Sequence, residues 1–282
     1  MTTLGDMTLR ATAYDLAGRS AVITLSRPKR GNAWTGRMHA EYMRCLATAE
    51  SDSNVRTIVV TGAGSTFCVG GDSEALEGHA KRGGYDDGLA KAGSDTTEAS
   101  LLSSDVDAEF NHQFSYHFGL TKPVIAAING PAAGVGLALG CFADLRFAVP
   151  GAKLTTAHGK LNLPPEFGLS WILPRHIGLT RAMDLILTSR IFLTDEAHQL
   201  GLINQLHPAD ELLDATLDYA EQLASTVSAG SLRASKQQVY VDQHRGIGQS
   251  VEESLRLLDE MMSHPDYTKG VAALQRKRPP NF

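Results

Sequence analysis

The chain has 282 residues, of which 43% are hydrophobic and 20% are charged, and its formal net charge is −5. A chain of this length can bury one large core, or one core with an appendage. The negative balance makes nucleic-acid binding a poor first hypothesis, because phosphate backbones are bound by basic surfaces. No apolar run is long enough for a membrane span, and the N-terminus lacks the apolar core of a signal peptide. We therefore expect a cytoplasmic protein with neither nucleic acid nor membrane as its partner.

The three cysteines, Cys45, Cys68 and Cys141, are widely spaced and flanked by apolar residues. This pattern is typical of buried, reduced thiols. The chain also lacks an H-E-x-x-H motif, paired C-x-x-C motifs, a G-x-S-x-G elbow and a GK[ST] phosphate loop. The sequence therefore predicts no metal site. It also lacks the motifs for a nucleophilic serine and for phosphate binding.

The N-terminal part of the chain predicts two buried strands, each followed by a loop. The strand at Val55–Thr61 is rich in β-branched residues, and the shorter run Ala21–Leu25 is likewise apolar. Between them, Thr35–Ala49 has apolar residues at helical spacing, with its first residue as the N-cap. The strand Ala21–Leu25 leads into a basic loop, Arg27–Asn32. The strand Val55–Thr61 leads into a glycine-bearing loop, Phe67–Asp72.

The next segment, Ser73–Gly119, is rich in Gly, Ser, Asp and His. Loops of this length are usually functional lids or disordered. We expect irregular structure around Gly78–Asp95, forming a lid over a substrate, and a short helix at about Ala108–Phe118 that rejoins the core. His112 and His117 follow this lid and could reach a pocket beneath it.

The stretch Lys122–Asp144 contains the strongest local signals. Its β-branched run, Val124–Ile128, predicts a buried strand, and a turn and a run of small residues then begin a buried helix. Three glycines of that helix, Gly134, Gly136 and Gly140, each weaken it by about 1 kcal/mol relative to alanine. They indicate the close approach of either a second backbone or a ligand at the helix N-terminus.

A dinucleotide site is the first alternative for these glycines. Their spacing, G-x-G-x-x-x-G, misses the dinucleotide-binding fingerprint by one residue. No acidic residue ends a second strand about 20 residues further on, where a ribose partner is expected. We therefore set this alternative aside.

Two more short strands, Leu145–Ala148 and Lys153–Thr155, continue a pattern in which strands alternate with helices or long crossings. This alternation predicts an α/β fold with parallel strands. The later part of the chain is helical and amphipathic, with helices predicted at Arg181–Leu187, Thr194–Gly201, Ala209–Ser225, Ser231–Val241 and Gln249–Ser263. We place a boundary near residue 205, between a core of residues 1–205 and a helical region of residues 206–282. The helical region must bury its apolar faces on the core or on another subunit.

Two glycine-bearing turns, each after a strong strand, carry the main chemical signal. Gly71 lies in the turn after Val55–Thr61, and Val135 lies between two glycines in the turn after Val124–Ile128. If the two strands are neighbours, one backbone N–H from each turn could point at a single oxygen. Such an oxyanion hole stabilises charge that develops on a carbonyl, and each donor contributes about 10²–10³ in rate.

Four motifs can be compared with known families: FCVGGD, INGPAAGVGLALGCFADLRFA, SRPKRGNAW and GLSWILPRHIGLTRAMDLILTSR. Together they resemble the enoyl-CoA hydratase/isomerase (crotonase) superfamily, over nearly the whole chain from about Ala21 to Phe282. The resemblance implies a crotonase-like spiral of ββα units, followed by a helical region that forms a homotrimer or a homohexamer. It also implies an acyl-CoA thioester as substrate. Coenzyme A would then be part of the substrate, and no separate cofactor is expected.

The resemblance also assigns roles to individual residues. The oxyanion donors would be the backbone N–H groups of Gly71 and of Val135, where many relatives have glycine. Arg27 and Arg30 match the segment that curls around the CoA adenine. Lys277 matches a lysine that reaches a CoA phosphate, often from a neighbouring subunit. Each of these three charges could equally be a solvated surface residue.

The catalytic carboxylates are where the chain departs from its relatives. Hydratases that resemble the family archetype use two glutamates, which match Ala138 and His158 here. Glu166 matches the single acidic base of some Δ3,Δ2-enoyl-CoA isomerases. Its neighbours Pro165 and Phe167 would desolvate it and raise its pKa toward neutrality, as a general base needs. Alternatively, Glu166 only begins the following helix, where an acid is favourable.

His158 is the rival base, because histidine titrates near neutral pH, although an isolated histidine is more often structural. Asp72 and Asp144 are interpreted as helix caps or buried partners. Three functions remain open at this point. The first is double-bond isomerisation of an enoyl-CoA through a thioester enolate, with Glu166 as proton shuttle. The second is hydration by a non-standard site with Glu166 or His158, and the third is acyl-CoA binding without catalysis.

Overall fold

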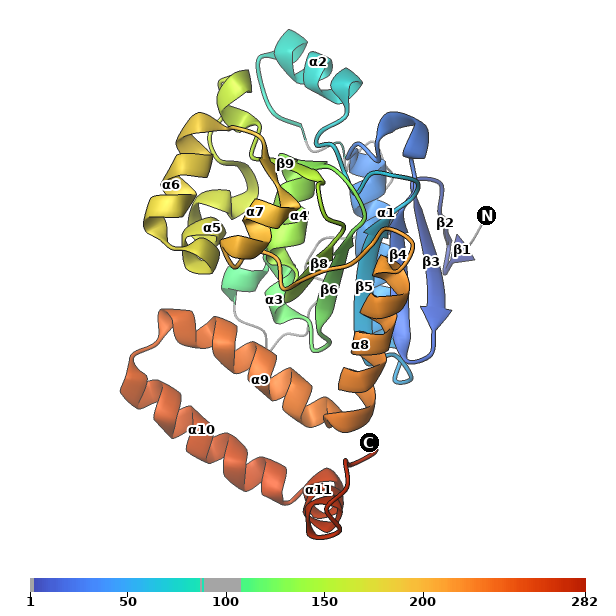
Figure 1. The fold of residues 1–282 in the computed structure, drawn as a ribbon, viewed down its shortest axis with the longest axis vertical. Helices are drawn as coiled ribbons and strands as arrows, with labels where there is room; N and C mark the ends of the chain where they lie inside the picture. Colours follow the sequence, from blue (N-terminus) through green and yellow to red (C-terminus); the bar gives the residue numbers. More distant parts are fainter. Residues whose placement is uncertain (1–2, 87, 89–107) are drawn as a thin grey trace.

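The computed structural model describes residues 3–86, 88 and 108–282, and a six-stranded sheet lies at its centre (Figure 1). The strand order is β11-β8-β6-β5-β4-β3, and every neighbouring pair is parallel except β3 with β4. The strands are β3 (Thr12–Ala17), β4 (Ser20–Leu25), β5 (Thr57–Gly62), β6 (Val124–Ile128), β8 (Leu145–Ala148) and β11 (Gln205–Leu206). The predicted α/β fold with parallel strands is therefore confirmed.

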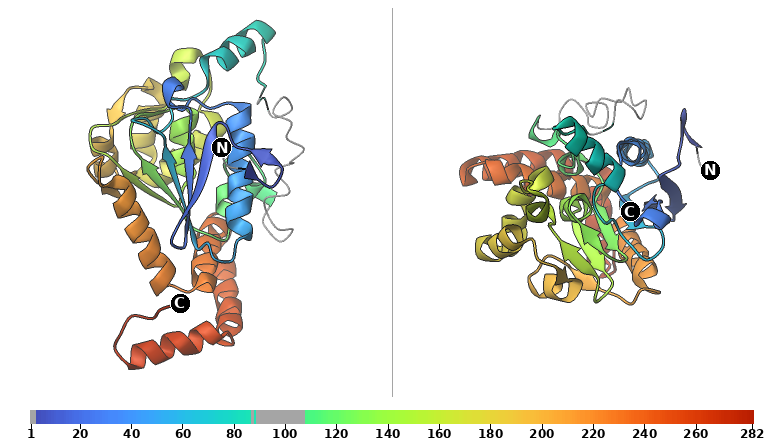
Figure 2. Two further views of the ribbon diagram at one scale, coloured as in Figure 1. Left: turned by 90° about the vertical axis from the view of Figure 1, so that its right-hand side faces the viewer. Right: turned by 90° about the horizontal axis from the view of Figure 1, so that it is seen from above.

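Helices cover both faces of this sheet, so its central strands β5 and β6 are buried throughout. Ile58 and Val60 of β5 join the larger core beneath α1 (Gly36–Ser51) and α4 (Val135–Phe142). Val59, between them, points to the opposite face and joins a second core with residues of α8 (Leu212–Thr226). Figure 2 shows α1 and α8 on opposite sides of the sheet.

The remaining elements surround this layered core. A small sheet has the order β10-β9-β7, and β1 and β2 form a separate two-stranded sheet. The strands outside the central sheet are β1 (Thr3–Leu4), β2 (Met7–Thr8), β7 (Ala132–Ala133), β9 (Lys153–Thr155) and β10 (Phe192–Leu193). The 3-10 helices are η1 (Pro28–Arg30), η4 (Ala108–Phe110), η5 (His158–Leu161), η6 (Glu166–Gly168) and η7 (Asp242–His244). The other helices are α2 (Ser73–Arg82), α3 (Tyr116–Gly119), α5 (Leu169–Ile177), α6 (Leu179–Thr188), α7 (Thr194–Gln199), α9 (Ala229–Val241), α10 (Ile247–Met262) and α11 (Pro265–Gln275).

The segment predicted as an irregular lid is partly helical. Residues 73–82 form α2, capped at its start by the Asp72 side chain and ended by Gly83 in a left-handed conformation. The expectation of irregular structure from Gly78 onward is therefore wrong as far as Arg82. Most of the remaining lid prediction falls on residues 87 and 89–107, which lie outside the described residues. The single helix expected at 108–118 is instead two short pieces, η4 and α3.

The three cysteines are free and buried, as predicted. Burial is the main reason that the pKa of each thiol, Cys45, Cys68 and Cys141, rises to about 12. The thiols are therefore protonated at neutral pH and behave as small apolar side chains.

The C-terminal helices α9, α10 and α11 extend from one end of the sheet domain, as Figure 1 shows. Helix α8, by contrast, lies against the sheet and contributes Leu212 and Ala220 to its core. Helix α10 has no buried residue at all. In the described part of the chain, no helix is long and apolar enough to cross a membrane.

The loop after β5 and the segment after β6 come into direct backbone contact. The Cys68 N–H donates to the Pro131 carbonyl at 3.2 Å, and the Ala133 N–H donates to the Cys68 carbonyl at 3.0 Å. Gly136 in α4 faces this loop, and a Cβ at that position would lie 2.1 Å from the Cys68 carbonyl oxygen. The glycines predicted the close approach of either a second backbone or a ligand. At Gly136 it is a second backbone that comes close.

Gly136→Ala should destabilise the protein, because the added methyl group must push the two backbone segments apart. Overpacking of this kind costs about 1–3 kcal/mol, and chemical denaturation measures it. Gly140→Ala is the matched control in the same helix, since its methyl group would meet only Ile128 Cδ1 at 3.4 Å. The control should be neutral or stabilising by up to about 1 kcal/mol. Equal stability of the two variants would contradict this account of the contact.

Candidate active site

The two predicted oxyanion donors follow backbone segments that run side by side. Cys68 and Ala132 form a parallel β-bridge. Three residues further along the two segments lie Gly71 and Val135. A Cβ on Gly70 would lie 3.2 Å from the Ala133 carbonyl oxygen, so the segments are still in contact just before the two donors.

The Gly71 amide is held from both sides by one residue, which lies just after the basic loop. The Trp34 N–H donates to the Gly70 carbonyl at 2.8 Å, and the Asp72 N–H donates to the Trp34 carbonyl at 3.0 Å. Gly71 itself is exposed, and no acceptor among the described residues takes its N–H. This amide is therefore fixed in orientation and available to a ligand.

Val135 is the first residue of α4, where backbone N–H groups lack partners within the helix. The preceding residue, Gly134, has φ 49° and ψ −118°, a conformation that favours glycine. Its N–H donates to the Thr155 carbonyl at 3.1 Å, which ties the start of the helix to β9. The helix dipole favours negative charge at this end.

Glu166 lies beside this helix start. Its Oε2 is 3.6 Å from the point that a Cβ on Gly134 would occupy. The side chain is half-buried, and within the described residues its carboxylate has no hydrogen bond and no ion pair. Desolvation by burial raises its pKa above the ordinary glutamate value. The structure therefore brings the predicted base next to the second predicted oxyanion donor.

A left-handed turn after Glu166 sets the course of the chain. Phe167 has φ 51° and Gly168 has φ 77°. Such a conformation is a true outlier for a bulky residue such as phenylalanine. A Cβ on Gly168 would lie 3.3 Å from the Phe142 ring, so the turn is pressed closely against α4.

His158, the rival base, is buried in η5, just beyond the segment that holds Gly134. Its Nδ1 has no hydrogen-bond partner among the residues that the structure describes. The neighbours Ala157 and Gly159 likewise provide no evident partner for this nitrogen. Ala138, which the resemblance matches to a family glutamate, is fully buried in α4 and carries no ionisable group.

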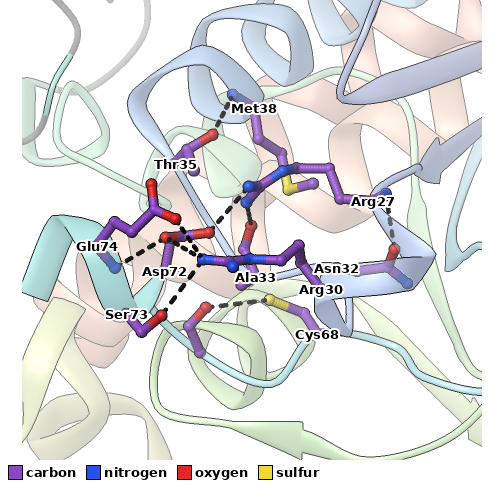
Figure 3. A network of polar contacts seen from close by, with 11 residues as sticks. Arg27, Arg30, Asn32, Ala33, Thr35, Met38, Cys68, Asp72, Ser73 and Glu74 are labelled. Atoms are coloured by element: carbon purple, nitrogen blue, oxygen red, sulfur yellow. Dashed lines mark hydrogen bonds and ion pairs between the residues drawn. The ribbon is translucent and has the colours of Figure 1, made fainter.

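The basic loop is joined by an ion-pair cluster, shown in Figure 3, to the glycine-bearing loop Phe67–Asp72, which we call the oxyanion loop after its predicted role. Arg27 Nη2 lies 2.9 Å from Asp72 Oδ2, and Arg30 Nη2 lies 3.2 Å from Asp72 Oδ1. Asp72 is 3% exposed and accepts the Glu74 N–H at 3.0 Å, which caps α2. Burial alone would raise the pKa of the Asp72 carboxyl, but the Glu74 amide and the two guanidinium groups outweigh it and lower this pKa.

Both arginines predicted near the CoA nucleotide therefore contact Asp72, the residue that follows Gly71. The interpretation of Asp72 as a helix cap and buried partner is confirmed. So is that of Asp144, which accepts hydrogen bonds from the Val124 N–H and the Tyr240 hydroxyl. The sequence did not indicate that Arg27 and Asp72 would meet, since their segments are joined only by tertiary contact.

Lys277 lies beyond the end of α11, is exposed, and has φ 50°. In Figure 1, α11 is at the opposite end of the molecule from α2, which begins two residues after Gly71. Within one chain, this lysine is therefore far from the two glycine loops. Its predicted contact with CoA stays a prediction that requires a neighbouring subunit.

His117 does not reach a pocket. It is 1% exposed, its Nε2 is hydrogen-bonded to the Tyr42 hydroxyl at 2.7 Å, and its Nδ1 is hydrogen-bonded to the Phe114 carbonyl at 2.7 Å. Burial lowers its pKa to about 3, so it stays neutral in the core. His112 is exposed on the preceding turn.

Comparison with known proteins agrees with this fold. Residues 18–282 match the family described as enoyl-CoA hydratase/isomerase. The 1,2-epoxyphenylacetyl-CoA isomerase of Escherichia coli (strain K12) is 33% identical over 261 residues, which cover 92% of this chain and 93% of that protein.

Solved structures match over nearly the whole chain. An enoyl-CoA hydratase from Polaromonas sp. JS666 has a TM-score of 0.82 and 26% identity, covering 96% of this chain and 99% of that one. An enoyl-CoA hydratase from Bacillus anthracis has a TM-score of 0.81 and 25% identity, covering 96% and 98%. The structure thus has the crotonase fold, with a helical C-terminal region. The chain belongs to the enoyl-CoA hydratase/isomerase family, and is an acyl-CoA enzyme of the hydratase or isomerase kind.

Asp72→Asn should lower both stability and turnover, because asparagine keeps the helix cap but removes the charge that holds Arg27 and Arg30. The expected loss of unfolding free energy is about 1–2 kcal/mol, since both guanidinium groups reach solvent. Glu74→Gln is the control, because Glu74 also pairs with Arg30 but its side chain is 82% exposed. The control should change stability by less than about 0.5 kcal/mol. An Asp72→Asn variant as stable and active as the wild type would refute a positioning role for the cluster.

Proposed function

We propose that the protein is an enoyl-CoA double-bond isomerase that works through an oxyanion-stabilised thioester enolate, with Glu166 as its single base. The observation that carries the proposal is the place of the Glu166 carboxylate, 3.6 Å from the Cβ position of Gly134. Ala138 provides no second carboxylate. One carboxylate is sufficient for a proton shuttle, whereas the paired glutamates of the archetypal hydratases hold and activate a water.

In the proposed reaction, the thioester carbonyl accepts hydrogen bonds from the Gly71 and Val135 N–H groups at about 2.7–3.1 Å each. Glu166 removes a proton from the α-carbon of a 3-enoyl-CoA, and the electron pair of that C–H bond passes to the carbonyl oxygen as an enolate. The enolate then collapses, the double bond moves to the 2-position, and Glu166 returns the proton to the γ-carbon. No atoms are gained or lost.

The environment of Glu166 suits this role. A general base is most effective when its pKa is near the working pH, and desolvation shifts the pKa of Glu166 in that direction. A carboxylate without hydrogen-bond partners is also free to accept a proton and to release it. The relative from Escherichia coli is named as an isomerase of an acyl-CoA, which supports the same reaction class.

Hydration is the second candidate, and one observation favours it. His158 is buried with an Nδ1 that has no partner in the described structure, at the position of a family glutamate. In this reaction, Glu166 or His158 would activate a water that adds to the double bond of a 2-enoyl-CoA.

Glu166→Gln keeps the size of the side chain and removes the base. It should lower isomerase kcat by at least about 10², because general-base catalysis contributes 10²–10⁴. Acyl-CoA affinity should change little. His158→Ala is the comparison variant and should retain isomerase activity with a 3-enoyl-CoA. Full activity of Glu166→Gln together with loss in His158→Ala would move the role to His158 and favour hydration.

The proposed role of Glu166 also predicts how isomerase kcat depends on pH. Isomerase kcat should rise with pH as Glu166 loses its proton, because only the carboxylate accepts the α-proton. The midpoint should lie above the ordinary glutamate pKa, since burial raises the pKa of this group. This acidic limb should be absent from the residual activity of Glu166→Gln. An unchanged pH profile in that variant would assign the limb to another group.

We also propose that residues 206–282 form a helical oligomerisation region, and that the protein is a homotrimer or a homohexamer. Apolar side chains recur along one stripe of α10 at helical spacing, at Ile247, Val251, Leu255, Leu258 and Met262, and each is at least 49% exposed. An exposed stripe of this kind is typical of a protein–protein contact. The proposed assembly would bring Lys277 of one subunit toward the CoA of another, while Arg27 and Arg30 of the same chain lie beside the nucleotide.

Sedimentation should show a trimer or a hexamer at micromolar concentration. Leu255→Glu should shift the protein toward smaller species, because a charge on the apolar stripe opposes burial. Gln249→Glu is the control, because it introduces a glutamate near the start of α10 but away from the stripe. The new carboxylate can still accept the Gly246 N–H, as the Gln249 side chain does. It should leave the assembly unchanged. A wild-type monomer would disprove the proposed oligomer.

A further inference from the structure

Aromatic side chains from four separate segments meet beside Glu166. The chain has only nine Phe, seven Tyr and two Trp residues. Yet Phe114 and Phe167 lie 5.4 Å apart at 86°, Trp34 and Phe114 lie 5.4 Å apart, and Tyr85 and Phe167 lie 6.5 Å apart at 64°. These centroid separations are in the range of attractive aromatic pairs. We refer to Trp34, Tyr85, Phe114 and Phe167 as the aromatic cluster.

The cluster adjoins both parts of the proposed site. Phe167 directly follows the base Glu166 in the chain. The backbone of Trp34 forms the two hydrogen bonds that bracket Gly71. An acyl group whose α-carbon faces Glu166, and whose carbonyl faces Gly71, would therefore lie close to the cluster.

Burial within the cluster is graded. Phe114 is 0% exposed and Trp34 is 7% exposed, whereas Tyr85 is 66% exposed and Phe167 is half-buried. Phe114 and Trp34 therefore form a buried floor of fixed rings. Tyr85 and Phe167 form a rim that a ligand can reach. Leu76 of α2 lies on the Gly71 side, 3.5 Å from the point that a Cβ on Gly71 would occupy.

The two central rings are both held in strained backbone. Phe114 has φ 65° and Phe167 has φ 51°, the left-handed region that bulky residues rarely adopt. Such residues persist only where their surroundings hold them, and they concentrate at ligand sites and active sites. The edge-to-face pair of Phe114 and Phe167 is thus maintained against a local conformational cost.

Resting on the proposed function, we propose that the acyl group of the substrate carries an aromatic ring, which packs against Phe167 and Tyr85 over Phe114. A flat ring offers a face and an edge to these side chains, as aromatic pairs prefer. A flexible alkyl chain of similar size offers neither, and it loses more rotational freedom when it is bound. Phe167 and Tyr85 are then the specificity-determining residues.

Calorimetric titration with phenylacetyl-CoA and hexanoyl-CoA tests the proposal. Neither thioester has a double bond in its acyl chain to be moved or hydrated, so both report binding alone. The wild type should bind phenylacetyl-CoA about three- to tenfold more tightly, the range expected of one aromatic pair. Phe167→Leu should reduce this ratio to within about twofold and leave hexanoyl-CoA affinity nearly unchanged.

Tyr85→Leu is the second variant, since an exposed side chain can be changed without loss of the fold, and it should also lower the ratio. Tyr267→Leu replaces an exposed aromatic residue on α11, outside the cluster, and should leave the ratio as in the wild type. Equal wild-type affinities for the two thioesters, or an unchanged ratio in both Phe167→Leu and Tyr85→Leu, would overturn the proposal.

The outcome is separable from that of the proposed function. Glu166→Gln should keep the wild-type binding ratio, because the aromatic cluster is intact. If this variant remained an active isomerase, the role of the base would fail while the binding ratio still measured the aromatic preference. If the ratio were absent while Glu166→Gln lost activity, only the substrate class would be wrong.

Discussion

The close approach of the Cys68 carbonyl to α4 is the contact on which the candidate active site depends. It requires a glycine at position 136, because a Cβ there would lie 2.1 Å from the Cys68 oxygen. Through this contact the loop after β5 runs beside the segment after β6, and the Cys68–Ala132 bridge sets their register. Gly71 and Val135 each lie three residues after that bridge along their own segment. A larger residue at 136 would separate the two amides proposed to share one oxygen.

Other interactions keep this arrangement fixed without using the amides themselves. Trp34 occupies the backbone groups on either side of Gly71 and leaves its N–H free of acceptors in the described structure. Asp72 then joins α2 to Arg27 and Arg30, which binds the oxyanion loop to the basic loop through charge. The orientation of the Gly71 N–H is therefore fixed in advance, as the proposed role of an oxyanion donor requires. In this arrangement the two arginines serve the oxyanion loop, and their contact with a CoA nucleotide would be an additional role.

The sequence predicts the regular parts of this fold well, because periodicity reports burial directly. Val124–Ile128, Leu145–Ala148 and Lys153–Thr155 are strands with the predicted bounds, and Thr35 caps α1 as expected. No range was predicted for helix α5, although the alternative interpretation of Glu166 assumed a helix after it; Pro174 lies inside α5, and proline normally marks a helix end. The edge strand β3 was missed too, because its burial is mixed and Asp15 interrupts its apolar pattern.

The candidate site, too, was predicted only in part from the sequence. The glycines at 134, 136 and 140 predicted the close approach of a second backbone or a ligand, because each weakens the helix, and a second backbone does come close at Gly136. Which backbone comes close could not be read from the chain, because the contact joins residues far apart in sequence. The same holds for the pairing of Arg27 with Asp72 and for the aromatic cluster. The desolvation of Glu166 was predicted from its neighbours Pro165 and Phe167, and burial does raise its pKa.

The most direct test of the central claim is exchange of the α-proton. A saturated acyl-CoA can form an enolate but cannot complete isomerisation, so incubation in D₂O isolates the first step. Proton NMR should show loss of the α-hydrogen signal with wild-type protein at a rate well above that of the thioester alone. Glu166→Gln should slow this exchange by at least about 10². Exchange that persists in Glu166→Gln, or that is absent from the wild type, would contradict an enolate formed by this carboxylate.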